Sequence, residues 1–223
     1  MHFISHVKDL FTDFLFPKSP EVLELEALSV ENLLDTLPRA TSLPDKYSMA
    51  LFDYSHPLVK KIIWELKYGG NTIIADGLGE ILYDHICLEL EDLALFESAN
   101  WRMSKPLLLP IPISGKRRFE RGWNQSELLC KKIMKHDNQK NFRYLPKALI
   151  KVLHTESQTK TRSKGERLEN LANSMKVLNA QSVRGEYVVV VDDVTTTGST
   201  FGEAQRALKT AGVKKILCVA VAH

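Results

Sequence analysis

The sequence predicts an α/β fold in which a mostly parallel sheet is flanked by helices. Short apolar runs typical of buried strands alternate with segments of helical periodicity along most of the chain. The clearest unit has a β-branched run at 187–191, a helical pattern at 201–210 and a second apolar run at 215–221. This order of strand, helix and strand is typical of parallel strands joined by a crossover helix.

The first forty-odd residues predict short helices, because each proline ends a helical pattern. Four prolines interrupt this segment: Pro17, Pro20, Pro38 and Pro44. We therefore expect a small N-terminal helical appendage, or hood, over residues 1–45 and one larger domain over residues 46–223.

The larger domain is expected to begin with a strand at 47–53, followed by helices over 57–69 and from 72 to beyond Leu90. The run PLLLPIPI at 106–113 predicts a strand buried on both faces, and its prolines place that strand near an edge or end it by Pro110. The remaining expected segments are a basic loop (SGKRRFERG), a helix near 124–135, a strand near 148–153, a polar stretch at 154–170 and a strand near 174–178.

Composition narrows the class of protein. Of the 223 residues, 44% are hydrophobic, which predicts a sizeable core and excludes a disordered chain. The apolar stretches are far shorter than the roughly 20 residues of a membrane-spanning helix. Cys87, Cys130 and Cys218 lie far apart in apolar settings, which argues against disulfides and a zinc site and favours buried thiols in a reducing cytoplasm.

The net charge of +3 conceals an uneven distribution along the chain. Residues 1–101 carry 7 Lys and Arg against 17 Asp and Glu, whereas residues 102–167 carry 17 against 5. The basic middle segment fits a polyanionic ligand, either a nucleic acid or a small phosphorylated molecule, and it equally fits a solvated basic face. Charge alone leaves these alternatives open.

The most specific motif is VVVVDDVTTTGST at 188–200. Ligands of open α/β sheets bind beyond the carboxyl ends of the strands, and the polar turn of this motif lies at such an end, directly before a helix. Its backbone N–H groups, with Gly198 allowing close approach, can bind a phosphate at the helix N-terminus. Because Asp192 and Asp193 can accept hydrogen bonds from hydroxyl groups, the motif predicts a sugar-phosphate site.

A second interpretation of this turn is purely structural, with Ser199 or Thr200 capping the helix. It leaves unexplained the two acids at the end of four valines. The chain contains neither G-x-x-x-x-G-K-[ST] nor G-x-G-x-x-G, so the sequence predicts neither a Walker loop nor a dinucleotide-binding loop.

These residues resemble those of a known family. The string at 188–200 is similar to the signature with which type I phosphoribosyltransferases bind phosphoribosyl pyrophosphate (PRPP). The ComF-like (competence protein F) branch of that family is indicated by three further segments: FDYSHPLVKKIIWELKYGGN, LLLPIPISGKRRFERGWNQSELL and QTKTRSKGERLEN. Together the matches cover most of residues 47–223, and the resemblance implies the type I phosphoribosyltransferase fold.

The resemblance implies a role for each matching residue. Asp192 and Asp193 would be the catalytic acid pair that holds the ribose hydroxyls. The 5′-phosphate would be enclosed by Thr196, Thr197, Gly198, Ser199 and Thr200. The pyrophosphate loop would provide Ser114, Gly115 and Lys116, with Arg117, Arg118 and Arg121 as nearby cations. A loop closing over the site would provide Gln158, Lys160, Arg162 and Arg167.

The implied activity is transfer of phosphoribosyl from Mg-PRPP to a nucleobase or amine, with release of pyrophosphate. Mg²⁺ would be held mainly by PRPP itself. The sequence does not specify the acceptor. Four aromatic residues near the expected hood could stack on a base, although helical spacing favours core positions: Tyr54, Trp64, Tyr68 and Trp123.

One feature departs from the family pattern. Many members carry a Cys-x-x-Cys zinc ribbon soon after an N-terminal LFP, but here Leu15-Phe16-Pro17 is followed by Lys18, Ser19 and Pro20. We therefore expect no zinc.

Two non-enzymatic alternatives stay open. One is a regulator that senses PRPP without turnover. The other is a nucleic-acid-associated protein serving DNA uptake, which is less favoured because the basic segment has few aromatic platforms for single strands. Homodimers are common in this fold, but no sequence feature specifies one.

Overall fold

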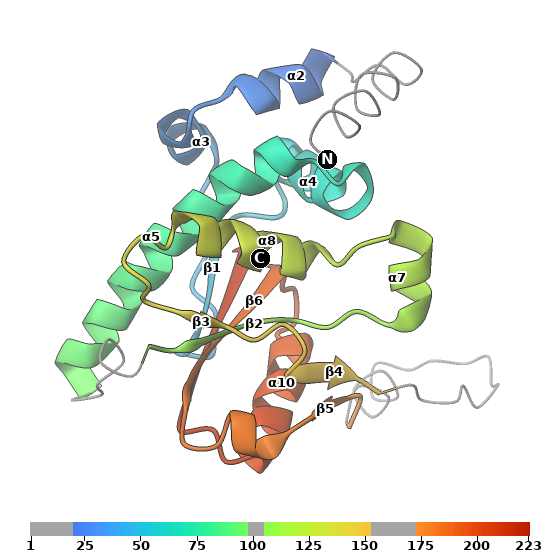
Figure 1. Cartoon of the computed structure of the whole chain (residues 1–223). Helices are drawn as coiled ribbons and strands as arrows, with labels where there is room; N and C mark the ends of the chain where they lie inside the picture. Colours follow the sequence, from blue (N-terminus) through green and yellow to red (C-terminus); the bar gives the residue numbers. More distant parts are fainter. Residues whose placement is uncertain (1–19, 98–104, 153–172) are drawn as a thin grey trace.

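The computed structural model describes residues 20–97, 105–152 and 173–223 (Figure 1). The elements before the basic segment are α2 (Pro20–Ala27), α3 (Val30–Thr36), β1 (Ser48–Phe52), α4 (Pro57–Trp64), the π-helix η1 (Glu65–Gly69) and α5 (Thr72–Glu97). They are followed by β2 (Leu107–Pro110), α7 (Gly115–Arg121), α8 (Gln125–His136), β3 (Arg143–Tyr144) and β4 (Leu149–Lys151). The last elements are β5 (Met175–Val177), the 3-10 helix η2 (Ala180–Ser182), β6 (Tyr187–Val194), α10 (Ser199–Thr210) and β7 (Lys215–Ala222).

Five strands form a parallel sheet in the order β1-β7-β6-β2-β3. The central strand β6 pairs with β2 from Leu107↔Val188 to Pro110↔Val191, and with β7 on its other side. The predicted α/β fold with a mostly parallel sheet is therefore confirmed. As expected, β2 ends at Pro110, although β3 lies outside it and forms the edge.

Helices cover both faces of the sheet (Figure 1). Val189 and Val191 of β6 point into one core, which they share with residues of α4, α5 and α8. Val188 and Val190 point into a second core that includes Phe201 of α10. Because both faces are covered, the first five residues of β6, Tyr187–Val191, form an unbroken apolar run in the sequence.

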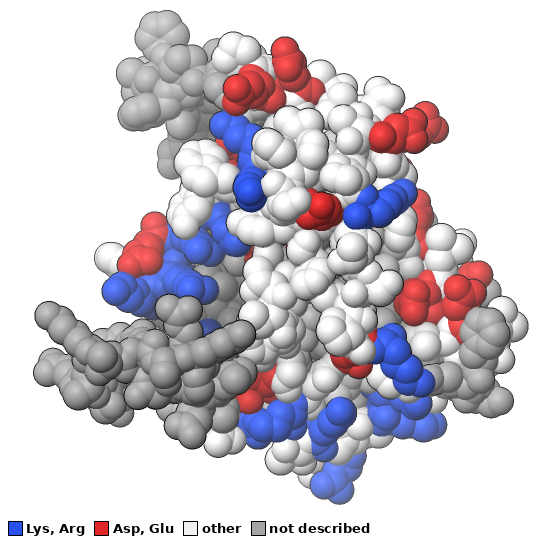
Figure 2. Space-filling view, turned by 180° about the vertical axis from the view of Figure 1, so that it is seen from behind, with Lys and Arg blue, Asp and Glu red and all other residues white. Residues whose placement is uncertain are grey.

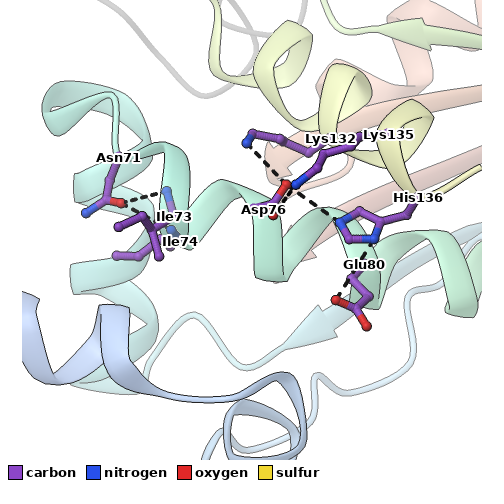
Figure 3. Close-up of polar contacts among 8 residues, drawn as sticks. All are labelled: Asn71, Ile73, Ile74, Asp76, Glu80, Lys132, Lys135 and His136. Atoms are coloured by element: carbon purple, nitrogen blue, oxygen red, sulfur yellow. Dashed lines mark hydrogen bonds and ion pairs between the residues drawn. The ribbon is translucent and has the colours of Figure 1, made fainter. Parts of the chain in front are cut away.

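The N-terminal helices pack on the same core as α5. Leu25 of α2 and Leu33 of α3 are buried in it. Asn71 links the two regions. Its Oδ1 caps α5 by accepting from the N–H of Ile74 at 3.1 Å (Figure 3). Its Nδ2 donates to Glu26 Oε1 at 2.6 Å. Residues 1–19 of the predicted appendage lie outside the described residues.

Helix α8 is fixed against α5 by close packing and by charge. A Cβ atom at Gly79 would lie 2.4 Å from Lys132 Cβ and 2.9 Å from the Lys132 carbonyl carbon, so the contact requires glycine. Asp76 accepts hydrogen bonds from Lys132 at 3.1 Å and Lys135 at 2.7 Å, and His136 Nε2 lies 3.6 Å from it (Figure 3). Burial raises the pKa of Asp76, but these hydrogen bonds outweigh burial and lower it.

Two predictions from the sequence are corrected. The segment SGKRRFERG is largely the helix α7 and not a loop: Ser114 Oγ accepts from the N–H of Arg117 at 3.3 Å as an N-cap, and Gly122 ends the helix at φ 82°. The strand predicted at 148–153 is shorter and pairs antiparallel with β5 in a separate two-stranded sheet. In the part of the chain that the structure describes, no helix is long and apolar enough to cross a membrane.

Candidate functional site

The predicted acid pair lies at the carboxyl edge of the sheet. Asp192 and Asp193 belong to β6, not to the turn after it, because the ladder with β7 continues to Val194↔Ala222. Only 6% of Asp192 and 4% of Asp193 is exposed. Both carboxylates are therefore held by a rigid strand in a largely desolvated environment.

Helix α8 provides partners for both acids. Ser126 Oγ donates to Asp192 Oδ1 at 2.9 Å, and Gln125 Nε2 donates to Asp193 Oδ1 at 3.4 Å. These residues open α8 after the N-cap Asn124, whose Oδ1 accepts from the N–H of Ser126 and whose Nδ2 donates to Ile111 O beyond β2. The start of α8 is thus fixed to the sheet at the acid pair.

The two carboxylates differ in their electrostatic surroundings. Burial, followed by the adjacent charge of Asp193, raises the pKa of Asp192 well above its usual range. Asp193 Oδ2 instead pairs with Lys67 Nζ of η1 at 2.9 Å. Ionisation is therefore disfavoured at Asp192, whereas the Asp193 side chain is in contact with a lysine.

The turn after β6 leads into α10, where Thr197 Oγ1 accepts from the N–H of Ser199 at 3.4 Å. Gly198 is the N-cap of α10, in the left-handed region at φ 72°, and makes no side-chain cap. Ser199 and Thr200 lie inside the helix, so the interpretation of either as the cap is wrong. The Thr197 and Ser199 hydroxyls contact each other, and Thr196 is exposed. The first N–H groups of α10 have no intrahelical acceptor, as at any helix N-terminus, and fit an anion.

The predicted pyrophosphate residues form α7 and its cap. Arg118 donates to both Glu127 oxygens, at 2.7 and 3.0 Å, which raises the pKa of Arg118 and lowers that of Glu127. Arg121 lies with its guanidinium carbon 5.1 Å from the Tyr68 ring centroid. Gly115, Lys116 and Arg117 are exposed. The structure thus places these cations at the same edge as the acids, with Arg118 and Arg121 already bound to protein groups.

The expectation that the aromatic residues belong to the core is wrong for two of them. Trp64 is 52% exposed and Tyr68 54%, with their ring centroids 5.6 Å apart. Tyr54 does pack against the core, and Trp123 is half-buried with its Nε1 donating to Leu66 O at 2.9 Å. Beside Trp123 lies a groove of about 470 Å³, whose lining includes residues at the end of η1, the end of α7 and the start of α8.

Three partners of the acid pair are absent from the sequence prediction: Lys67, Gln125 and Ser126. All three fall inside segments that carry the family resemblance, and Lys67 directly follows buried Leu66, where a charge is unexpected. A further cation is Lys151 of β4, whose pKa is lowered by burial and then by the charge of Arg117. These contacts join distant segments, so spacing along the sequence does not reveal them.

Four predicted residues of the closing loop lie outside the described residues: Gln158, Lys160, Arg162 and Arg167. The strand that follows this segment is fixed to α10. Glu203 accepts from the N–H of Met175 at 2.9 Å, and Arg206 donates both to Glu203 and to Met175 O. The helix that begins at the candidate phosphate turn therefore also anchors β5.

Comparisons with known proteins show what the chain is similar to. Residues 143–223 match the phosphoribosyl transferase domain family. The chain is 30% identical over 173 residues to the DNA utilization protein YhgH of Escherichia coli K12, a match covering 70% of this chain and 63% of that protein. It is 32% identical over 110 residues to competence protein F of Haemophilus influenzae, covering 49% of this chain and 46% of that protein.

The matches thus span less than two thirds of the length of these relatives. Among solved structures, a hypoxanthine phosphoribosyltransferase from Staphylococcus aureus aligns with a TM-score of 0.36 and 16% identity, covering 66% of this chain and 61% of that chain. An allosteric regulatory enzyme of purine biosynthesis aligns with a TM-score of 0.41 and 15% identity, covering 71% of this chain and 30% of that chain.

Proposed function

The chain contains a phosphoribosyl transferase domain and is a distant relative of competence proteins, and from this premise we propose that it binds Mg-PRPP and transfers phosphoribosyl to an acceptor. The observation that supports this most is the juxtaposition at one sheet edge of the buried Asp192–Asp193 pair and the N-terminus of α10, where the N-cap Gly198 has no side chain. The first suits ribose hydroxyls and the second suits a 5′-phosphate.

In the proposed reaction, the acceptor displaces pyrophosphate at the anomeric carbon through an oxocarbenium-like transition state. Asp192 and Asp193 would orient the ribose and stabilise the positive charge that develops on it. The phosphate turn, Thr196 to Thr200, would fix the other end of the sugar. Lys116, Arg117 and the neighbouring arginines of α7 would neutralise the departing pyrophosphate.

The residues present fit a magnesium ion that arrives with its substrate. In the described residues no group of three or more His, Cys, Asp or Glu could hold a metal, but two adjacent carboxylates face the proposed ribose site. Mg²⁺ is commonly held by one or two carboxylates together with substrate phosphates. When bound, it would supply charge neutralisation at the pyrophosphate oxygens.

We also propose that residues 1–45 and the exposed aromatic residues of the α4–η1 segment form the hood that selects the acceptor. Trp64 and Tyr68 are available for stacking on a planar base, since both rings are half exposed. No other feature of the described residues specifies a purine, a pyrimidine or an amine.

The test is a panel of nucleobases and amines, each mixed with the protein, Mg²⁺ and PRPP and read by pyrophosphate release. We expect release with one class of acceptor. Binding of PRPP by calorimetry, with no release across the panel, would identify a PRPP sensor instead. Absence of both binding and release would contradict the proposal.

A second candidate function, nucleic-acid binding, is favoured by one specific observation. Five cations gather near the amino ends of the strands: Lys46, Arg184, Lys209, Lys214 and Lys215. In Figure 2, Lys and Arg side chains gather at the bottom of the molecule, the end at which the strands begin. Lys46 and Lys215 lie near the Tyr47 ring, so this surface combines charge with an aromatic group.

The names of the relatives, which refer to DNA utilization and competence, agree with this candidate. Its test is the salt dependence of binding to single-stranded DNA. Displacement of counterions from several phosphates would make affinity fall steeply between about 50 and 200 mM salt. A flat salt response, or no binding at low salt, would exclude it.

A further inference from the structure

A lysine from an irregular helical turn lies at the centre of the candidate site. Lys67 Nζ is 2.9 Å from Asp193 Oδ2, and the two side chains are only 22% and 5% exposed. Desolvating two charges is costly, and a buried ion pair often adds little net stability. Its presence beside the acid pair therefore calls for an explanation other than stability.

The helical geometry of the α4–η1 segment directs Lys67 toward the acids. Residues Glu65–Gly69 form a π-helical turn that continues α4 without a break. One residue inserted into an α-helix rotates the following side chains by about 100° around its axis. The turn then ends at Gly70, which is in the left-handed region at φ 58°.

Contacts with the start of α8 fix this turn in place. Trp123 Nε1 donates to Leu66 O, and a Cβ atom at Gly70 would lie 3.1 Å from the Trp123 ring. Trp123 directly precedes the Asn124 cap of α8, and α8 brings Gln125 to the other oxygen of Asp193. Lys67 and Gln125 therefore contact the two oxygens of Asp193, and each lies next to the hydrogen bond between Trp123 and Leu66.

From this geometry, and resting on the proposed function, we infer that Lys67 is a positioning residue for the ribose of Mg-PRPP. Its ammonium group contacts Oδ2 of Asp193 and would fix this carboxylate where it can accept hydrogen bonds from the ribose hydroxyls. Asp192 is hydrogen bonded to Ser126 and, within residues 20–97, 105–152 and 173–223, has no such cation in contact, so the two acids would take different parts in binding.

The charged and titratable groups around the pair belong to several elements. They are Asp192 on the same strand, Lys67 on η1, Lys151 on β4, Arg117 near Lys151, and the buried thiols of Cys130 and Cys218. Burial raises the pKa of both thiols, so they are uncharged at neutral pH. Lys67 is the cation in direct contact with Asp193 among the described residues.

The test measures Mg-PRPP affinity by calorimetry at pH 7. In Lys67→Met we expect the affinity to fall about 30-fold, because a buried carboxylate loses its partner. A residue that acts only through the packing of its side chain would not be rescued by the charge-preserving variant Lys67→Arg.

Three further variants control the experiment. Lys67→Arg, which keeps the charge, should bind within about threefold of wild type, whereas Lys67→Gln, which keeps only a hydrogen-bond donor, should resemble Lys67→Met. Lys60→Met, which removes an exposed lysine of α4, should bind like wild type. If Lys67→Met does not fold, the comparison of Lys67→Gln with Lys67→Arg decides.

The possible outcomes are distinguishable. If wild type binds Mg-PRPP while Lys67→Met or Lys67→Gln shows unchanged affinity, the inference is overturned and the proposed function stands. If wild type does not bind Mg-PRPP, both are overturned.

Discussion

The two edges of the parallel sheet carry charge in different ways. At the carboxyl edge, Asp192 and Asp193 are almost completely buried and are held by α8 and η1. At the amino edge, about 17–20 Å away along β6, the cations lie on the surface, and Lys209 and Lys214 are exposed. One strand thus links a desolvated, ordered cluster to a solvated basic surface.

The difference shows which charges can support chemistry. Coulombic interactions are several times stronger in a desolvated site than in water, and surface charges are screened by salt. The carboxyl edge can therefore orient one small ligand, whereas the amino edge can attract a polyanion without fixing its position. Substitutions at the two edges should have separable effects.

The largest effect of a single substitution is expected at Gly198. Gly198→Val forces a β-branched residue into the left-handed region at the candidate phosphate turn, which should weaken Mg-PRPP binding about 100-fold and destabilise the fold by about 2 kcal/mol. Calorimetry and thermal unfolding measure the two changes. Gly202→Ala is the matched control: it lies in α10 with open space around it and should add up to about 1 kcal/mol. Wild-type affinity in Gly198→Val would contradict a phosphate site at this turn.

The next largest effect concerns the α5–α8 contact that supports the carboxyl edge. Gly79→Ala places a methyl group against the Lys132 backbone, so α8 must shift, at a cost of about 1–3 kcal/mol by denaturant unfolding. Gly77→Ala is the control, because its Cβ would make an ordinary 3.6 Å contact with Leu33. Equal stability of the two variants would show that Gly79 does not set the position of α8.

A smaller effect, of opposite sign, is expected for Asp192→Asn. Because the pKa of Asp192 is raised in the folded protein, the folded state binds its proton more tightly, and stability falls as pH rises through the interval between the unfolded and folded pKa values. Asp192→Asn should therefore unfold at a higher temperature than wild type at pH 8, with little difference at pH 3. Lower stability of the variant at pH 8 would contradict this sign.

The smallest effect on PRPP is expected at the amino edge. Lys209→Ala combined with Lys214→Ala should change Mg-PRPP affinity less than about twofold, because exposed charges this distant are screened. If DNA binds here, the same variant should reduce the slope of log affinity against log salt by about 2. A large loss of Mg-PRPP affinity would show that the two edges are coupled.

The sequence predicts the sheet well because the relevant information is local. The strand β2, the first five residues of β6 and the residues of β7 after Lys215 are apolar at every position, and the motif at 188–200 places the acid pair and the phosphate turn next to each other. The α7 helix is missed because a run of cations resembles a loop, although Ser114 and Gly122 are good caps.

The parts of the site that the sequence does not predict depend on distant contacts. Lys67 reaches Asp193 only through a π-helical turn, which has no recognisable sequence pattern, and Ser126 meets Asp192 only because α8 packs on the sheet. The exposure of Trp64 and Tyr68 also depends on distant contacts. Helical spacing shows which residues share a face of a helix, but not which face a neighbouring element covers.

The most direct test of the account is calorimetric titration of wild type and of the double variant Asp192→Asn, Asp193→Asn with Mg-PRPP. Glu186→Gln, which alters an acid at the amino edge, serves as the control. We predict that wild type and the control bind and that the double variant shows no measurable binding while remaining folded. Equal Mg-PRPP affinity in the double variant and wild type would contradict the assignment of the carboxyl edge as a phosphoribosyl site.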